Sequence, residues 1–210
     1  MIVEWLSKGG IVLYLLIAIS FVVVAVMMER FVFFRRVSFK INVFINAFYE
    51  HLDIYQLEAA EQLCKENDTP IANIALKGLK ACNKNRDELK EVLANAGSHE
   101  IPKIEANLGI LSTIAYISPL LGLLGTVLGL LKVFQDLYSA TLREEMPGIG
   151  LLASGIWEAL LTTVAGLSVG IISYILHNYF YVKKERFIGT LEEASDELLE
   201  IFIEKCDIKN

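Results

Sequence analysis

Three long runs of the 210-residue sequence carry almost no charge, and they decide what the chain can fold into. The first runs from Gly9 to Met28 and the second from Ala106 to Leu131, and neither contains a charged residue. The third, from Met146 to Val182, contains only Glu158. About 20 apolar residues form a helix that crosses the ~30 Å hydrocarbon core of a bilayer. We therefore expect an all-α membrane protein with three transmembrane helices.

Basic residues beside the first and third runs predict how the chain is threaded. The tract ERFVFFRR follows the first run, and Lys183, Lys184 and Arg186 follow the third. Because cytoplasmic flanks carry an excess of lysine and arginine, the N-terminus is expected outside and the C-terminus inside. The expected segments are an outer N-terminus 1–8, a span 9–28, a cytoplasmic helical region 29–105, a span 106–135, an outer loop 136–150, a span 151–182 and a cytoplasmic C-terminal helix 183–210. The first span is interpreted as a retained anchor and not as a cleaved signal peptide. Lys8 is the one basic residue before it, and no small-x-small cleavage site follows.

Helix-start signals divide the cytoplasmic region, which shows no strand-like alternation of useful length. Asp53 to Gln56 and Asn85 to Glu88 resemble capping boxes, and Thr69 precedes Pro70 as an N-cap would. Pro102 is expected to kink or interrupt the helix that approaches the second span. In the C-terminal segment, apolar residues at helical spacing predict one packed face on a helix that extends the third span. These residues are Phe187, Leu191, Ala194, Leu198 and Phe202.

Small residues form a stripe along the second span and another along the third. Spacings of three or four residues place each set near one helix face. The stripe in the second span is Ser112, Ala115, Ser118, Gly122, Gly125 and Gly129, and that in the third is Gly155, Ala159, Thr163, Gly166, Gly170 and Ser173. Small residues let transmembrane backbones approach closely, where lipid gives no hydrophobic drive between helices. It stays open whether a given glycine does more than pack helices within one subunit.

Glu158 is the residue of the spans that most strongly indicates function. A carboxylate near the bilayer centre costs roughly 2.5 to 3.5 kcal/mol on insertion scales, so such groups usually face a bundle interior or a water-filled cavity and mark an ion path. Thr162 and Thr163 follow it, and their hydroxyls either relay protons or bond the carbonyl one turn back. Lys132 and Asp136, four residues apart, are interpreted as a pair at the outer end of the second span.

Several other functions find no support in the sequence. The G-x-G-x-x-A match that starts at Gly148 has no strand before it, which argues against a dinucleotide-binding site. GLLGTVLG lacks the lysine of a phosphate-binding loop. Ser154 and His177 lie roughly 35 Å apart along one helix, which is too far for the two to act together in a serine hydrolase. We expect no enzyme activity, metal or cofactor. The sequence has no basic tract or aromatic array for nucleic acid. Cys64, Cys82 and Cys206 have no partner at ligand spacing and are expected to be three free thiols in the cytoplasm.

Two motifs on successive spans resemble the ExbB/TolQ branch of the MotA/TolQ/ExbB proton-channel family. The second span reads LGILSTIAYISPLLGLLGTVLGLLKVF and the third GIWEALLTTVAGLSVGIISYILHNY. The combination of GLLGTVxG and EALxxTxxGL, in this order and after ERFVFFRR, is specific, and the resemblance covers nearly the whole chain. It places the family's pore threonine of the second span at Thr126, its glutamate at Glu158 and its third-span threonine at Thr163.

The resemblance implies the large subunit of a motor in the bacterial inner membrane, with the N-terminus in the periplasm. Five copies would form a homo-oligomeric ring around the single spans of two copies of an ExbD- or TolR-like partner. Proton flow there would drive a TonB- or TolA-like protein that reaches the outer membrane, so the work would be outer-membrane transport or envelope maintenance.

Two positions depart from the family pattern. The family's third span commonly contains the sequence AIPA, whereas this chain has GIIS at residues 170–173, so Ile172 replaces a common proline. His177 replaces the tyrosine that usually precedes Asn178. Loss of the proline would leave the third span straighter, and His177 either joins the proton path or sits at the interface.

The alternatives belong to other classes. A MotA-like flagellar stator subunit is disfavoured, because three spans replace the four of that branch. A non-conducting scaffold would use its stripes only for assembly, and an intramembrane enzyme comes last.

Overall fold

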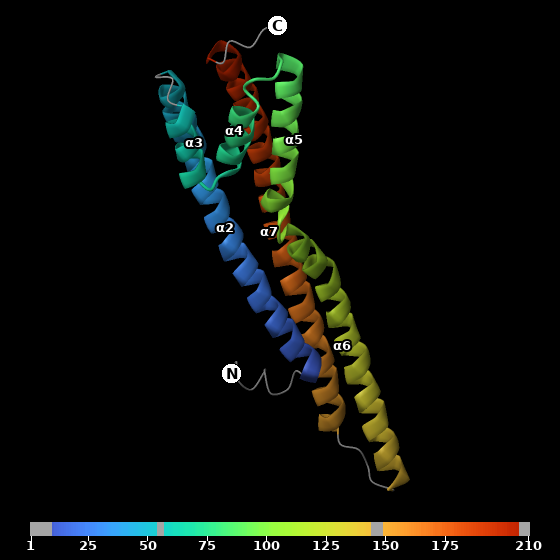
Figure 1. The fold of residues 1–210 in the computed structure, drawn as a ribbon. Helices are drawn as coiled ribbons and strands as arrows, with labels where there is room; N and C mark the ends of the chain where they lie inside the picture. The colour runs from blue at the N-terminus through green and yellow to red at the C-terminus, as the bar shows by residue number, and fades with distance from the viewer. Residues whose placement is uncertain (1–9, 54–56, 144–148, 206–210) are drawn as a thin grey trace. The chain divides into compact units, whose positions relative to one another are not determined.

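The computed structural model describes residues 10–53, 57–143 and 149–205, and these residues are helical with short connections. The helices are α2 (Gly10–Asp53), α3 (Leu57–Glu66), α4 (Pro70–Lys80), α5 (Arg86–Glu105), α6 (Leu108–Leu142) and α7 (Ile149–Lys205), as Figure 1 shows. No strand occurs in the described ranges. The chain divides into two compact units. The membrane unit comprises residues up to 28 and 107–179, and the helical bundle comprises 29–106 and 180–210.

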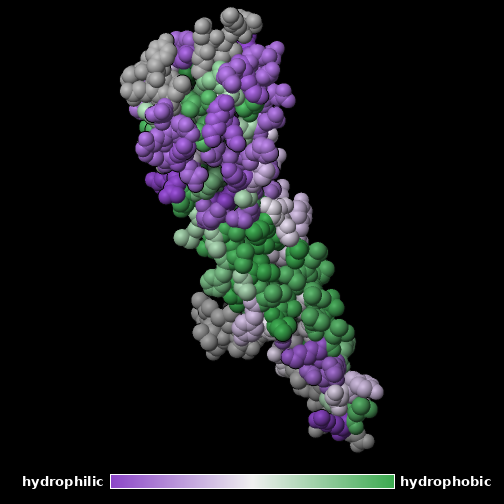
Figure 2. Space-filling view, viewed as in Figure 1, coloured by the Kyte–Doolittle hydropathy of each residue, from purple (hydrophilic) through white to green (hydrophobic). Residues whose placement is uncertain are grey.

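Three long apolar helices pass through the membrane unit. Three helices are long and apolar enough to cross a membrane, and they lie within Gly10–Val37, Arg86–Leu142 and Leu152–Lys205. Hydrophobic residues form a broad band on the face of this unit that Figure 2 shows. Many of them are highly exposed, for example Leu120 at 62% and Val164 at 61%. Exposed apolar surface of this extent suits a lipid environment or contact with other chains. The protein is an all-α membrane protein with three transmembrane helices, as predicted.

The helical bundle has a core built from helices that are distant in sequence. Phe34 of α2 stacks on Phe180 of α7 with ring centroids 6.1 Å apart, and Phe48 meets Phe202 edge-on at 5.8 Å. All five residues of the predicted apolar face in the C-terminal segment are buried, which confirms that prediction. Burying one such phenylalanine contributes roughly 1.5 to 3 kcal/mol. Hydrophilic residues cover much of the face of this unit that Figure 2 shows.

Two of the three predicted helix starts are confirmed. Thr69 caps α4 and accepts a hydrogen bond from the backbone N–H of Ala72, with Pro70 in the first turn. Asn85 caps α5, because its side chain accepts a hydrogen bond 2.9 Å long from the N–H of Glu88. The third start, Asp53 to Gln56, extends into residues 54–56, which lie outside the described residues.

The helix before the second span does not stop at Pro102. Helix α5 continues to Glu105, and the chain breaks at Ala106 and Asn107, which has a left-handed φ of 61°. Proline removes one backbone donor, but the helix can continue for the turn beyond it. Asparagine tolerates the left-handed conformation better than most residues, so the break falls there.

The expectation of three free thiols is wrong for Cys82. Cys64 is a free, buried thiol, whereas Cys82 is disulfide-bonded, and Cys206 lies outside the described residues. A disulfide depends on how close two Cα atoms come in the fold, and spacing along the sequence does not give that distance.

Candidate functional site

The small-residue stripes of α6 and α7 face each other in the membrane unit, backbone against backbone. A Cβ atom added to Gly166 would lie 2.5 Å from the carbonyl oxygen of Ser118 and 2.8 Å from the Cα atom of Gly122. One added to Gly122 would lie 3.0 Å from the carbonyl oxygen of Thr162. Real Cβ atoms essentially never approach other atoms closer than 3.0 Å. Helices α6 and α7 therefore approach as closely as they do because glycine lies at these positions.

The other four glycines predicted to pack helices lie along the same contact. Each takes a neighbour from the opposite helix: Gly125 meets Thr162, Gly129 meets Ala159, Gly155 meets Val133, and Gly170 meets Pro119. The two stripes thus pack α6 against α7 within a single chain.

The three candidate pathway threonines occupy different places. The hydroxyl of Thr163 donates a hydrogen bond to the carbonyl oxygen of Gly122, 3.2 Å away on α6. Thr162 is buried, and its hydroxyl donates to the carbonyl of Ala159 in its own helix at 2.8 Å. The hydroxyl of Thr126 donates within α6, to the carbonyl of Leu123 at 2.6 Å. Within one chain, Thr162 and Thr163 therefore lie at the α6–α7 contact, and Thr126 makes its hydrogen bond within α6.

Glu158 lies beside Lys132 on the neighbouring helix. Its Oε2 atom is 3.8 Å from the Lys132 Nζ atom, and its side chain is 22% exposed against 67% for the lysine. The prediction that Lys132 pairs with Asp136 is therefore wrong, since the ammonium group reaches across to α7 instead. Two unit charges about 4 Å apart attract by about 1 kcal/mol in water and about 4 kcal/mol near a protein surface.

The start of α2 closes the other side of Glu158. Gly10 has a φ of +58°, and a Cβ atom there would collide with the Oε1 atom of Glu158. A helix N-terminus carries partial positive charge that favours a nearby carboxylate. A cavity of about 120 Å³ is lined by these two residues, by Lys132 and Thr162, and by glycines of α6. The sequence contained signals for this site, namely Lys132 directly after the second charge-free run and Gly10 at the start of the first.

The two departures from the family pattern lie in the middle of α7. The helix is continuous through Ile172, whose side chain is 55% exposed. Gly170 and Ser173, on either side of it, are buried. His177 is half-buried. Position 172 thus belongs to the outer face of the membrane unit and lies away from the α6–α7 contact.

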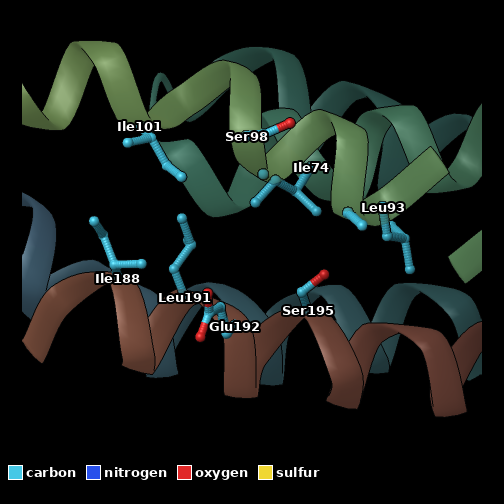
Figure 3. Close-up of a pocket in the computed structure, with 10 residues that line it drawn as sticks. Ile74, Leu93, Ser98, Ile101, Ile188, Leu191, Glu192 and Ser195 are labelled. Atoms are coloured by element: carbon cyan, nitrogen blue, oxygen red, sulfur yellow. The ribbon is translucent and has the colours of Figure 1, made fainter. Parts of the chain in front are cut away.

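A second cavity, of about 210 Å³, lies in the helical bundle between α5 and α7. Figure 3 shows Ile101 of α5 pointing toward α7, and Ile188 and Leu191 of α7 pointing back. Glu192 is the one charged residue among the described residues that line it. Its lining is largely apolar and has no facing pair of ionisable groups, so the ionisable site of interest is the one at Glu158.

The fold and this site together define a three-span helical membrane protein with an ionisable carboxylate held inside its spans. Comparison with known proteins identifies the family: residues 66–193 match the model of the MotA/TolQ/ExbB proton channel family. The chain belongs to this family.

Individual relatives agree with the family match. The chain is 31% identical over 194 residues to the ExbB-like 3 protein of Synechocystis sp., covering 90% of each chain. It is 30% identical over 176 residues to the Tol-Pal system protein TolQ of Pseudomonas aeruginosa, covering 79% of this chain and 74% of the relative. A shorter match of 91 residues, 33% identical, joins it to the biopolymer transport protein ExbB of Salmonella typhimurium and covers 43% of this chain and 36% of the relative. The resemblance to the ExbB/TolQ branch is thereby confirmed.

Proposed function

We propose that this protein is the large subunit of a motor in the inner membrane that is driven by the proton-motive force. Five copies form a ring around two copies of an ExbD/TolR-like single-span partner. Proton flow through this assembly does mechanical work on a TonB/TolA-like protein, for outer-membrane transport or envelope maintenance. The names of the ExbB and TolQ relatives support this role, and the protein itself is not an enzyme.

The observation that carries the proposal is the position of Glu158. It is the only charged residue of the run from 146 to 182, and it lies at the contact of α7 with α6 and with the start of α2. Counting nine residues from Ile149 at 1.5 Å each puts it about 14 Å along the helix. An ionisable group this far into a span is costly, and residues of this kind usually mark an ion path.

Three threonines complete the proposed path. Thr126 lines the inner wall of the ring in this proposal. Its hydroxyl bonds within α6 and makes no hydrogen bond to α7 among the described residues. Thr162 stands one turn beyond Glu158 on α7, Thr163 is the next residue, and both offer hydroxyls along the same helix. Hydroxyl groups both donate and accept, so they can pass a proton from one oxygen to the next.

The glycine contact supplies a surface on which the motor can move. A proton that crosses the membrane releases about 2.3 kcal/mol per 100 mV. Helices that meet through backbone atoms, as at Gly122 and Gly166, present no large side chains to hold one register. Energy of this size can therefore shift one helix against another.

The proposed topology follows from the charges beside the spans. Residues 1–8 and 136–150 lie in the periplasm, spans 9–28, 106–135 and 151–182 cross the membrane, and 29–105 and 183–210 lie in the cytoplasm. Arg30, Arg35 and Arg36 at the end of the first span support this orientation. Fusion of an alkaline phosphatase, which is active only in the periplasm, after residue 140 should give activity, and fusion after residue 95 should give none. The reverse pattern would overturn the orientation.

The experiment that tests the function is proton uptake by vesicles that contain the protein purified from its own membranes with its bound partners. Glu158→Gln should assemble normally and lose proton uptake. The control is Glu91→Gln, which removes an exposed carboxylate from the helical bundle and should leave uptake unchanged. Full uptake by Glu158→Gln would remove this carboxylate from the path.

Native mass spectrometry of the same preparation tests the assembly. Five copies of this chain with two small single-span chains are expected. A monomer, or a pair without partners that persists in several mild detergents, would contradict the ring and favour a scaffold.

A further inference from the structure

The cavity at Glu158 is bounded by residues of three helices, and its chemistry is simple. Residues of α2, α6 and α7 line it. Among the described lining residues, Lys132 and Glu158 are the titratable ones, and the rest are glycine or apolar apart from Thr162. The described residues thus place one ammonium group and one carboxylate in this cavity.

The two side chains differ in how they reach each other. The Glu158 side chain is mostly enclosed, and its Oε1 atom lies against Gly10, while its Oε2 atom faces the Lys132 Nζ atom at 3.8 Å. The lysine side chain is two-thirds exposed, and it contributes to the lining of the cavity from α6. The carboxylate thus has one oxygen toward α2 and one toward α6.

We propose that Lys132 is a positioning residue: a tethered counter-ion that holds the Glu158 carboxylate at the meeting point of the three spans. This inference rests on the proposed function, in which Glu158 lies on the proton path. The lysine gives the ionised carboxylate a partner that cannot diffuse away and that belongs to the neighbouring helix.

The pairing links proton binding to the contact between helices. An ionised Glu158 attracts the ammonium group, and the attraction is strengthened by the low dielectric of the surroundings. When a proton binds to the carboxylate, the group becomes neutral and most of that attraction is lost. One link between α6 and α7 is then released, while the glycine contact allows the two helices to shift.

The test uses the full chain purified from its own membranes. The variants are Lys132→Met, Lys132→Arg, Glu158→Gln and the double variant Lys132→Met with Glu158→Gln, and the control is Asp136→Asn one turn further along α6. The first readout is the melting temperature, compared as a double-mutant cycle. The effects of Lys132→Met and Glu158→Gln on the melting temperature should not be additive. The double variant should therefore melt close to the two single variants. Lys132→Arg and Asp136→Asn should melt like the unaltered protein.

The second readout is infrared spectroscopy at constant pH, which a merely structural role for Lys132 would not move. The carboxylate band of Glu158 is assigned from the difference spectrum against Glu158→Gln. This band should shift in Lys132→Met and return to its normal position in Lys132→Arg. Additive melting temperatures together with an unmoved band would overturn the proposal. If Lys132→Met fails to accumulate, recovery in the double variant supports the pair, because both charges are then removed, and continued failure overturns it.

These outcomes separate the pairing from the proposed function. If Glu158→Gln keeps full proton uptake while the cycle shows coupling, the pair exists and the proton path lies elsewhere. If Glu158→Gln abolishes uptake while the cycle is additive, the path stands and Lys132 has no positioning role.

Discussion

The hydroxyl of Thr163 donates a hydrogen bond to the main-chain carbonyl of Gly122, and this bond joins α7 to α6 at a distance of 3.2 Å. The bond is possible because glycine at position 122 lets the threonine backbone come close: a Cβ atom on Gly122 would lie 3.1 Å from the Thr163 Cα atom. A polar link and a close backbone approach therefore occur at the same point of the membrane unit.

Replacing Thr163 separates its structural role from its proposed role in the path. Thr163→Val removes the hydroxyl and should lower stability by only about 0.6 kcal/mol, the average measured for polar contacts between membrane helices. Thr163→Ser keeps the donor and should match the parent protein. Unfolding in a denaturing detergent measures stability, and proton uptake by vesicles measures the path. A large loss of uptake in Thr163→Val with little loss of stability is expected, and equal uptake in both variants would remove this hydroxyl from the path.

The same substitution should have opposite effects at two glycines. Gly166→Ala should destabilise the protein by about 1 to 3 kcal/mol, because its Cβ atom would overlap the backbone of Ser118 and Gly122. Gly109→Ala should stabilise the protein by up to about 1 kcal/mol, because no atom lies within 4 Å of its Cβ position and alanine favours helix. Melting temperatures in detergent check both. Equal shifts in the same direction would show that helix propensity alone acts at Gly166.

Ser118 should tolerate loss of its hydroxyl. The side chain is fully buried, and its Oγ atom has no hydrogen-bond partner among the residues that the structure describes. Because an unpaired buried polar atom costs about 1 to 3 kcal/mol, Ser118→Ala should be neutral or stabilising. The matched control is Ser173→Ala, where the equally buried hydroxyl donates to the Val169 carbonyl at 2.7 Å. If Ser118→Ala melts lower than Ser173→Ala, the Ser118 hydroxyl finds a partner in the assembled protein.

Cys64 should react slowly with thiol reagents while the protein is folded. Burial, followed by the nearby Glu61 carboxylate, raises the pKa of this thiol to about 12 from its usual value near 9. The neutral thiol is therefore favoured by folding, a contribution that is fully present below pH 9 and is lost as the pH rises toward 12. At pH 8, only about one thiol in ten thousand is the reactive thiolate, against about one in ten in the unfolded chain.

Alkylation at pH 8, followed by mass spectrometry of the peptide that contains Cys64, measures this. Reaction should be far slower in the native protein than in denaturant. Glu58→Cys places a second thiol at an exposed position of the same helix and should react quickly in the folded state. Comparable rates at the two positions in the native protein would contradict the burial of Cys64.

Features set by local sequence could be predicted, and features set by how helices cross could not. The three spans follow from charge-free length, and the caps at Thr69 and Asn85 follow from residues within a few positions of each other. The partner of Lys132 is different, because Asp136 lies one turn away on the same helix and Glu158 lies across a helix contact. Local spacing favoured the aspartate, whereas the close approach of α6 to α7 brings the glutamate within reach.

The approach of Gly10 to Glu158 shows the same limit. Gly10 at the start of the first span is visible in the sequence, but its nearness to residue 158 depends on where α2 meets α7. The stripes themselves were visible, and the structure adds which glycine meets which residue. The pathway roles of Glu158 and Thr163 stay predictions that the proton-uptake experiments address, and those of Thr126 and Thr162 stay predictions as well.

The contact between α6 and α7 at Gly122 and Gly166 also limits which reporters can test the proposed motion of these helices. Cysteine pairs, spin labels and fluorophores all add a side chain, and at these positions any side chain wedges apart the two helices whose separation is to be measured. Isotope labels on the main-chain carbons of glycine add no atoms. Solid-state magnetic resonance on such labels can therefore test whether one span slides against the other, in an unaltered interface.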